Sequence, residues 1–174
     1  MTRVDRPWRY WAGLAACTVL IWIGLAQAAP VPLLALVDLG FHEFGHLVAA
    51  PLPDLATALA GSVAQVAVPA GLAVYFMVRQ RDLLAVGLCL AWAGTSARQV
   101  AVYVADAPYQ ALPLIGGEHD WAYILAGNLE AAPTIAAAVM FLGWMLALGG
   151  VGACALGLAR ATSAGRVPAP PTPI

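Results

Sequence analysis

The sequence predicts an all-α membrane protein, a polytopic transmembrane helix bundle with about four to six membrane segments. Of the 174 residues, 62% are hydrophobic and only 10% are charged, and the mean hydropathy is +0.82. A typical soluble domain carries about 25% charged residues. The formal net charge of -1 is uninformative about nucleic acid, but the sequence has no basic patch, so no nucleic-acid partner is expected. The lipid bilayer is the expected environment of this chain.

Apolar runs that are long enough to cross a bilayer cover residues 10–29, 31–50, 55–78, 83–105 and 133–158. They are expected to form one transmembrane domain over residues 1–160, followed by a proline-rich, disordered tail over residues 161–174. The run 31–50 lies between prolines, so it is either a full span or a re-entrant segment. A re-entrant segment would place the arginine clusters on one side of the membrane, as the positive-inside rule prefers.

The N-terminal residues 1–28 have two interpretations. Ala26-Gln27-Ala28 resembles the cleavage site of a signal peptide that follows a basic region. Trp8, Tyr10 and Trp11 are instead typical of the aromatic belt of a retained transmembrane helix. We favour the retained helix, with a cytoplasmic N-terminus, in a multi-pass protein of a bacterial-type cytoplasmic (inner) membrane.

One apolar run carries the pattern H-E-x-x-H, formed by His42, Glu43 and His46. Residues four apart share a helix face, so the two imidazoles can bind one metal ion. Glu43 follows the first histidine and can act as a general base on water without binding the metal itself. Ionisable groups in such an apolar setting are costly and are functional by default. The alternative is a helix with two hydrogen-bonded histidines and an unrelated carboxylate.

A catalytic zinc usually has three protein ligands and an open fourth position. The chain contains only three histidines, and the third, His119, precedes Asp120 in a polar loop. We therefore expect His119 or Asp120 to complete the site, with a slight preference for His119, and Glu118 is a poorer choice. The structural alternative is that His119 and Asp120 begin the next helix, with Asp120 as its N-cap.

Two further polar residues lie in apolar runs near the motif. Asp38 stands four residues before His42, so it can orient a metal ligand by hydrogen bonding, or serve as a simple cap or water contact. Gln65 lies in the middle of the next span, where an unsatisfied amide would cost several kcal/mol. It either joins neighbouring helices or donates hydrogen bonds to a substrate.

The segment from Phe41 to Ala49 resembles the zinc helix of the site-2-protease group of intramembrane metalloproteases. In that family two histidines bind zinc, and the glutamate activates water for peptide-bond hydrolysis within the bilayer. The stretch Gly61–Gln65 is similar to the family's substrate-holding Gly-x-x-x-Asn element, with glutamine in place of asparagine. Pro113–Gly117 is similar to the element that supplies the third ligand, but Ile115 stands where that ligand, an aspartate, belongs.

The resemblance implies a minimal, divergent zinc metallopeptidase, with Zn²⁺ as cofactor and Glu43 as base. Its expected substrate is a membrane protein or a transmembrane peptide. One alternative is a metal transporter or metal-binding membrane protein that uses the same histidines without hydrolysis. Another is a structural zinc site, which would be closed by a fourth ligand such as Glu118 or Asp120.

Overall fold

The computed structural model describes residues 6–115 and 118–164, and these described residues contain helices and no strand. Four helices are long and apolar enough to cross a membrane, which confirms the predicted all-α polytopic bundle. The long helices are α1 (Pro7–Ile21), α3 (Asp54–Tyr75), α4 (Leu83–Asp106) and α6 (Ala132–Ala164). Short π-helical turns extend α1 over Trp22–Ala26 and α3 over Phe76–Gln80, and a 3-10 turn, Leu129–Ala131, precedes α6.

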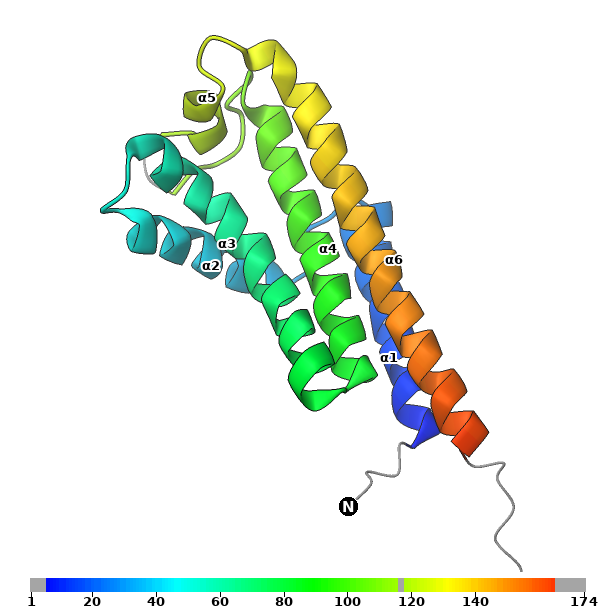
Figure 1. The fold of residues 1–174 in the computed structure, drawn as a ribbon. Coiled ribbons are helices and arrows are strands. Elements are labelled where there is room, and N and C mark those ends of the chain that lie inside the picture. Colours follow the sequence, from blue (N-terminus) through cyan, green and yellow to red (C-terminus); the bar gives the residue numbers. More distant parts are fainter. Residues whose placement is uncertain (1–5, 116–117, 165–174) are drawn as a thin grey trace, which may run out of the picture.

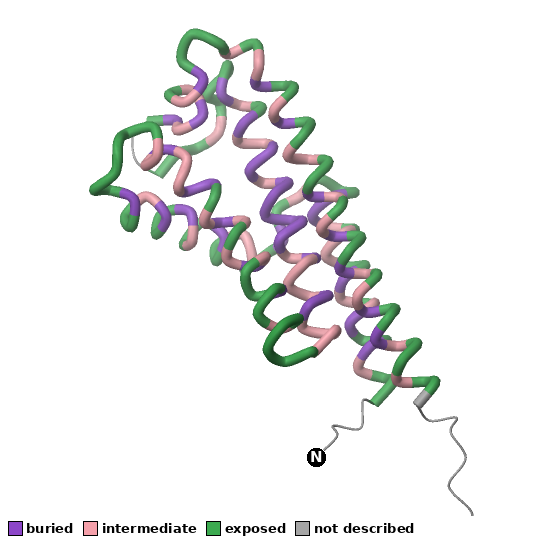
Figure 2. The backbone as a smooth tube through the Cα atoms, in the orientation of Figure 1, coloured by how far each residue is buried: buried purple, intermediate pink, exposed green. Residues whose placement is uncertain are grey.

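Helix α4 is the central helix of the bundle. It packs against α6 on one side and α3 on the other, and α1 lies along α4 and α6 (Figure 1). Of the most hydrophobic stretch of α4, 56% is buried, against 28% or less in the other three long helices. Figure 2 shows the buried residues concentrated along α4, with exposed residues on the outer faces of its neighbours. A side chain on α4 can therefore reach any of the other long helices.

Small residues allow α4 and α6 to approach closely. Gly87 and Gly94 lie seven residues, or about two turns, apart on α4, and Gly143 and Gly150 have the same spacing on α6. A Cβ added at Gly94 would lie 2.6 Å from the Gly143 carbonyl oxygen, and one at Gly150 would lie 2.5 Å from the Gly87 carbonyl oxygen. This contact is typical of membrane helices, which associate through backbone approach between small residues.

Helix α2 (Leu34–Ala49) carries the H-E-x-x-H motif and is not one of the four long helices. Its 16 residues rise about 24 Å at 1.5 Å per residue, less than the roughly 30 Å of a bilayer core. Pro51 and Pro53 follow its end, and α3 begins directly after Pro53. The helix lies obliquely against α3 (Figure 1). Residues 31–50, expected to form a full or a re-entrant span, thus contain a helix that is too short for a full span and packs on the bundle.

The start of α1, the end of α6 and the α3–α4 turn lie at one end of the bundle, and helix α5 (Asp120–Ile124) lies at the other (Figure 1). At the first end Asp82 caps α4 by accepting hydrogen bonds from the Leu84 and Ala85 amides, and Arg9 lies 3.7 Å from the Asp82 carboxylate. Helix α6 continues to Ala164, four residues into the expected tail, and residues 165–174 lie outside the described part of the chain.

Replacing Gly150 with alanine should destabilise the bundle, whereas the same change at Gly152 should not. The added methyl at Gly150 would meet the backbone of α4, while nothing lies within 4 Å of a Cβ at Gly152. We expect Gly150→Ala to cost about 1–3 kcal/mol of stability, and Gly152→Ala to be neutral or stabilising by up to about 1 kcal/mol through helix propensity. Thermal unfolding of both variants in detergent checks this. Equal shifts in Tm would contradict the α4–α6 contact.

Candidate metal centre

The two motif histidines lie on the face of α2 that packs against α3. Thr57, Gly61 and Gln65 follow at intervals of four residues, so they share the opposing face of α3. A Cβ at Gly61 would overlap His46 Nε2 and lie 2.7 Å from His42 Nε2. Gly45 makes the matching approach from α2, since a Cβ there would lie 2.8 Å from Ala64 Cβ. The absence of side chains at both glycines creates the space that the two imidazoles occupy.

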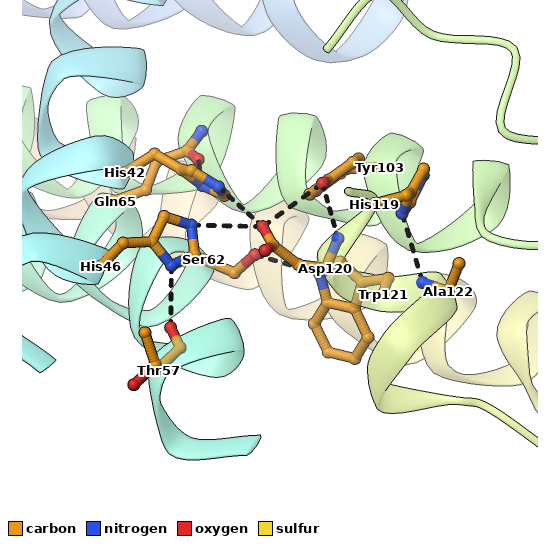
Figure 3. A network of polar contacts seen from close by, with 10 residues as sticks. All are labelled: His42, His46, Thr57, Ser62, Gln65, Tyr103, His119, Asp120, Trp121 and Ala122. Atoms are coloured by element: carbon orange, nitrogen blue, oxygen red, sulfur yellow. Dashed lines mark hydrogen bonds and ion pairs between the residues drawn. The ribbon is translucent and has the colours of Figure 1, made fainter. Parts of the chain in front are cut away.

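Asp120, the first residue of α5, meets both histidines (Figure 3). One carboxylate oxygen, Oδ2, lies 3.1 Å from His42 Nε2 and 3.2 Å from His46 Nε2. The three potential ligand atoms lie within 4.8 Å of one another. Among the described residues, these three side chains form the one such group of three or more His, Cys, Asp or Glu. Residues far apart in the chain, on α2 and α5, thus converge on one point.

Each histidine turns its other ring nitrogen to an oxygen atom. His46 Nδ1 lies 2.8 Å from the Thr57 carbonyl oxygen, and His42 Nδ1 lies 3.3 Å from Gln65 Oε1. These oxygens can only accept, so they favour a proton on Nδ1 and leave the Nε2 lone pair free to bind a metal. Metal-binding histidines usually have such a partner, which fixes the tautomer and the ring orientation.

Contacts from two helices hold Asp120 in place. The Tyr103 hydroxyl of α4 donates to Asp120 Oδ2 over 3.3 Å and accepts from the Asp120 amide over 3.0 Å. The indole of Trp121 donates to Ser62 Oγ over 3.0 Å, which ties α5 to α3. Burial raises the pKa of Asp120, but the contacts with His42, His46 and Tyr103 lower it more. The net pKa lies below the ordinary value, so the carboxylate is ionised at neutral pH.

His119, the residue slightly preferred from sequence as third ligand, is directed away from this group. It caps α5, since its Nδ1 accepts a hydrogen bond from the Ala122 amide over 3.2 Å. Its ring stacks on Tyr103, and its Nε2 lies 3.3 Å from Asp106 Oδ2 without making a hydrogen bond. Geometry therefore places Asp120, the other expected candidate, in the group and leaves His119 out. The N-cap of α5 is His119 rather than Asp120, which reverses the capping alternative.

Two cavities adjoin the metal group. The larger, of about 550 Å³, is lined by His42, His46 and Asp120, by Glu43 and Gln65, and by the loop residues from Leu112 to Ile115. The smaller, of about 300 Å³, shares His46, Glu118 and Asp120 with the larger and is also lined by Asp54 and Thr57. Ile115, at the position where the resembled element has its aspartate, lines the larger cavity, while Gly116 and Gly117 lie outside the described residues.

The structure brings together His42, Glu43, His46 and Asp120 around the larger cavity, together with Gln65. Asp38 is fully buried behind the site and contacts α4 rather than a motif histidine. Sequence reasoning missed Tyr103, Thr57 and Gln99. The carbonyl of Thr57 leaves no trace in a residue pattern, and Tyr103 and Gln99 carry no recognisable spacing relative to the motif.

The donor set fits a catalytic zinc ion. Two imidazole nitrogens and one carboxylate oxygen are ligand types that zinc accepts, and three protein ligands leave a fourth position open. That position would face the larger cavity, because all three ligands line it. A structural zinc would need a fourth side chain, and the described His, Cys, Asp and Glu residues place only three in the group.

Comparisons of the chain with protein-family models, with curated proteins and with solved structures found no match. The interpretation of the site therefore rests on its own geometry and chemistry.

Gly61→Ala should weaken zinc binding without unfolding the protein. The new methyl would occupy the space of both imidazoles, and displacement of the ligands should lower zinc affinity by at least about 10-fold, the lower end of the effect of disturbed ligand support. Gly71→Ala on the same helix is the matched control, because nothing lies within 4 Å of its Cβ. Zinc competition with a chelator measures both affinities. Equal zinc affinities in the two variants would show that the space left by Gly61 is not needed for zinc binding.

Asp120→Ala and His46→Ala should each lose bound zinc, whereas His119→Ala should retain it. The first two changes remove atoms of the converging group, and His119 Nε2 faces Asp106 instead. Metal analysis of detergent-purified protein gives the zinc content of each variant. Loss of zinc in His119→Ala together with its retention in Asp120→Ala would reverse the ligand assignment.

Proposed function

We propose that this chain is an intramembrane zinc metallopeptidase, a divergent relative of the site-2-protease group, that hydrolyses peptide bonds of membrane-embedded substrates. The observation that carries the proposal is the convergence of His42, His46 and Asp120 on the wall of a cavity that Glu43 also lines. Metal ligands, a carboxylate base and an open space for a substrate are the parts that metal-assisted hydrolysis requires.

Zinc held by His42, His46 and Asp120 would act as a Lewis acid toward a water molecule and toward the peptide carbonyl. Glu43 is exposed and lines the cavity, so its carboxylate can accept a proton from the attacking water. The same group then returns the proton to the leaving amine nitrogen. Tyr103 holds Asp120 in position, and the Thr57 carbonyl holds His46 in position, while the peptide bond is hydrolysed.

The larger cavity suits an apolar peptide segment. Leu39 on α2 and the loop residues Leu112, Leu114 and Ile115 give the cavity an apolar part of its wall. A transmembrane segment that is locally unwound could place side chains against this wall and its backbone near Glu43. The smaller, more polar cavity offers a separate route by which water can reach His46 and Asp120.

The arrangement of charges supports a cytoplasmic location for the end of the bundle with the start of α1 and the end of α6. The α3–α4 turn with Arg79 and Arg81, and Arg160 near the end of α6, lie at this end (Figure 1). The positive-inside rule then orients the protein in a bacterial-type inner membrane as a multi-pass protein. The metal group, close to α5, would lie toward the opposite face.

A second candidate function is metal transport, and one observation favours it. His46 and Asp120 line both cavities, so an ion bound there would border two spaces. Transport would make Glu43 a ligand or a proton relay, so zinc flux into proteoliposomes should then depend on Glu43. The H-E-x-x-H pattern with its adjacent glutamate favours hydrolysis over transport.

Glu43→Gln should retain zinc but lose peptidase activity. The amide keeps the shape of the side chain and cannot accept the proton, so the rate should fall by about 10²–10⁴-fold, the usual contribution of a general base. The assay uses wild-type and variant protein in proteoliposomes with a mixed set of single-pass transmembrane peptides, and mass spectrometry detects the cleavage products.

Glu118→Gln is the matched control for this substitution, because Glu118 lines the same cavity from the loop. We expect its rate to stay within a few-fold of the wild type. An equal loss in both variants, or wild-type cleavage by Glu43→Gln, would contradict the assignment of Glu43 as base. Zinc flux without any cleavage would favour transport.

A further inference from the structure

Asp38 is a fully buried carboxylate with three hydrogen-bond donors from one face of α4. Its Oδ1 accepts from Trp92 Nε1 over 2.7 Å and from Ser96 Oγ over 2.8 Å, and its Oδ2 accepts from Gln99 Nε2 over 2.9 Å. A buried carboxyl group costs free energy unless donors compensate its lost hydration, and these three do so. The contacts dock α2 onto α4 and leave Oδ2 to a single donor, Gln99.

The Gln99 contact continues toward the metal centre through a second amide. Gln99 Oε1 accepts from Gln65 Nε2 over 3.5 Å, and Gln65 Oε1 lies 3.3 Å from His42 Nδ1. The four side chains therefore form one hydrogen-bonded chain that runs from Asp38 to His42. Both amides point their NH₂ groups toward Asp38 and their carbonyl oxygens toward His42.

The direction of this chain decides which nitrogen of His42 is free. Asp38 accepts at both of its oxygens, so Gln99 turns its NH₂ to Asp38 Oδ2, and Gln65 in turn donates its NH₂ to Gln99. Gln65 then presents its carbonyl oxygen to His42, which favours the proton on Nδ1 and leaves Nε2 as the metal ligand. Side-chain amides can rotate by half a turn and reverse the chain, whereas the backbone carbonyl that holds His46 cannot.

We propose that Asp38 is a positioning residue that sets the direction of the Gln99–Gln65 amide chain and thereby holds His42 in the tautomer that binds metal through Nε2. This role rests on the metal site of the proposed function and not on the reaction performed there. It also assigns Gln65 to the support of a metal ligand, in place of the substrate contact expected from sequence.

Asp38→Asn is the decisive substitution because it keeps the shape and removes one acceptor. The single oxygen of asparagine is favoured at the position of Trp92 and Ser96, where two donors meet it. Its NH₂ then faces Gln99, both amides reverse, and Gln65 presents NH₂ to His42 Nδ1. We expect zinc affinity to fall by about 10- to 100-fold, as for other partners of metal-bound histidines.

Gln99→Leu should cause the same loss of affinity, because it interrupts the chain. The double variant Asp38→Asn/Gln99→Leu should lose little more zinc affinity than either single variant, because each change disrupts the same hydrogen-bonded chain. Ser96→Ala is the matched control: it removes a docking hydrogen bond of Asp38 but leaves the chain direction intact, so zinc affinity should stay within about threefold of wild type, less than the partner effect.

Proton NMR of the protein loaded with Co²⁺ separates positioning from docking. A histidine bound through Nε2 has an exchangeable Nδ1 proton whose signal the paramagnetic ion shifts far from the other resonances. Wild type and Ser96→Ala should show two such signals, from His42 and His46. At saturating Co²⁺, Asp38→Asn should lose or shift only the His42 signal, because the Thr57 carbonyl still protects the His46 proton.

Four results would overturn the proposal: two unchanged signals in Asp38→Asn, joint loss of both signals, equal loss of zinc affinity in Ser96→Ala, or absence of any metal binding by the wild type. None of these measurements uses peptide cleavage. A failure of the peptidase assay with the metal results as expected would therefore reject the proposed reaction and leave the role of Asp38 standing.

Discussion

The close approach of α2 to α3 is the constraint on which the site depends. Gly45 and Gly61 face each other's helices without side chains, and the imidazoles of His42 and His46 occupy the space that a Cβ at Gly61 would take. This contact gives each histidine its oxygen partner, from Thr57 and Gln65. With a wider separation between these helices, the Nδ1 contacts would lengthen beyond hydrogen-bonding range and the two Nε2 atoms would no longer share a target.

The remaining helices supply the hydrogen-bond partners of the site that do not lie on α2 or α3. Helix α4 is buried between its neighbours and provides Tyr103 for Asp120 and Gln99 for Gln65. The close α4–α6 contact between glycines keeps α4 in place. Each unsatisfied polar group in a low-dielectric interior costs free energy. The carboxylates of Asp38 and Asp120 avoid this cost through donors on α4.

The sequence was sufficient for the fold class and for the position of the motif. Apolar runs marked the long helices to within a few residues, and the spacing of His42 and His46 marked their common face, because both signals are local. The choice between His119 and Asp120 was not local. Adjacent residues at the start of a helix point in different directions, and the capping bond from the Ala122 amide to His119 decides which one turns inward.

Longer-range partners were also beyond the sequence. Asp38 lies one turn before His42, and that spacing indicated a direct role on the same helix face, but the residue reaches the site only through α4. The amide of Gln65 indicated a polar contact at mid-span without naming the partner. Such pairings depend on how the helices cross, and no periodicity within a single helix encodes a crossing.

The separation of the ligands along the chain has a consequence for biogenesis. The histidines lie on one hairpin and acquire their Nδ1 partners from contacts between neighbouring segments, which form early because little chain must be closed. Asp120 is 78 positions beyond His42 and lies after α4 in the chain, so α4 is synthesised before it. A nascent chain that exposes α2 and α3 alone offers an incoming ion two nitrogens and no carboxylate from α5. If the site binds a metal ion, the fraction of purified protein that carries the ion would therefore also report the fraction in which α5 is packed against α2 and α3.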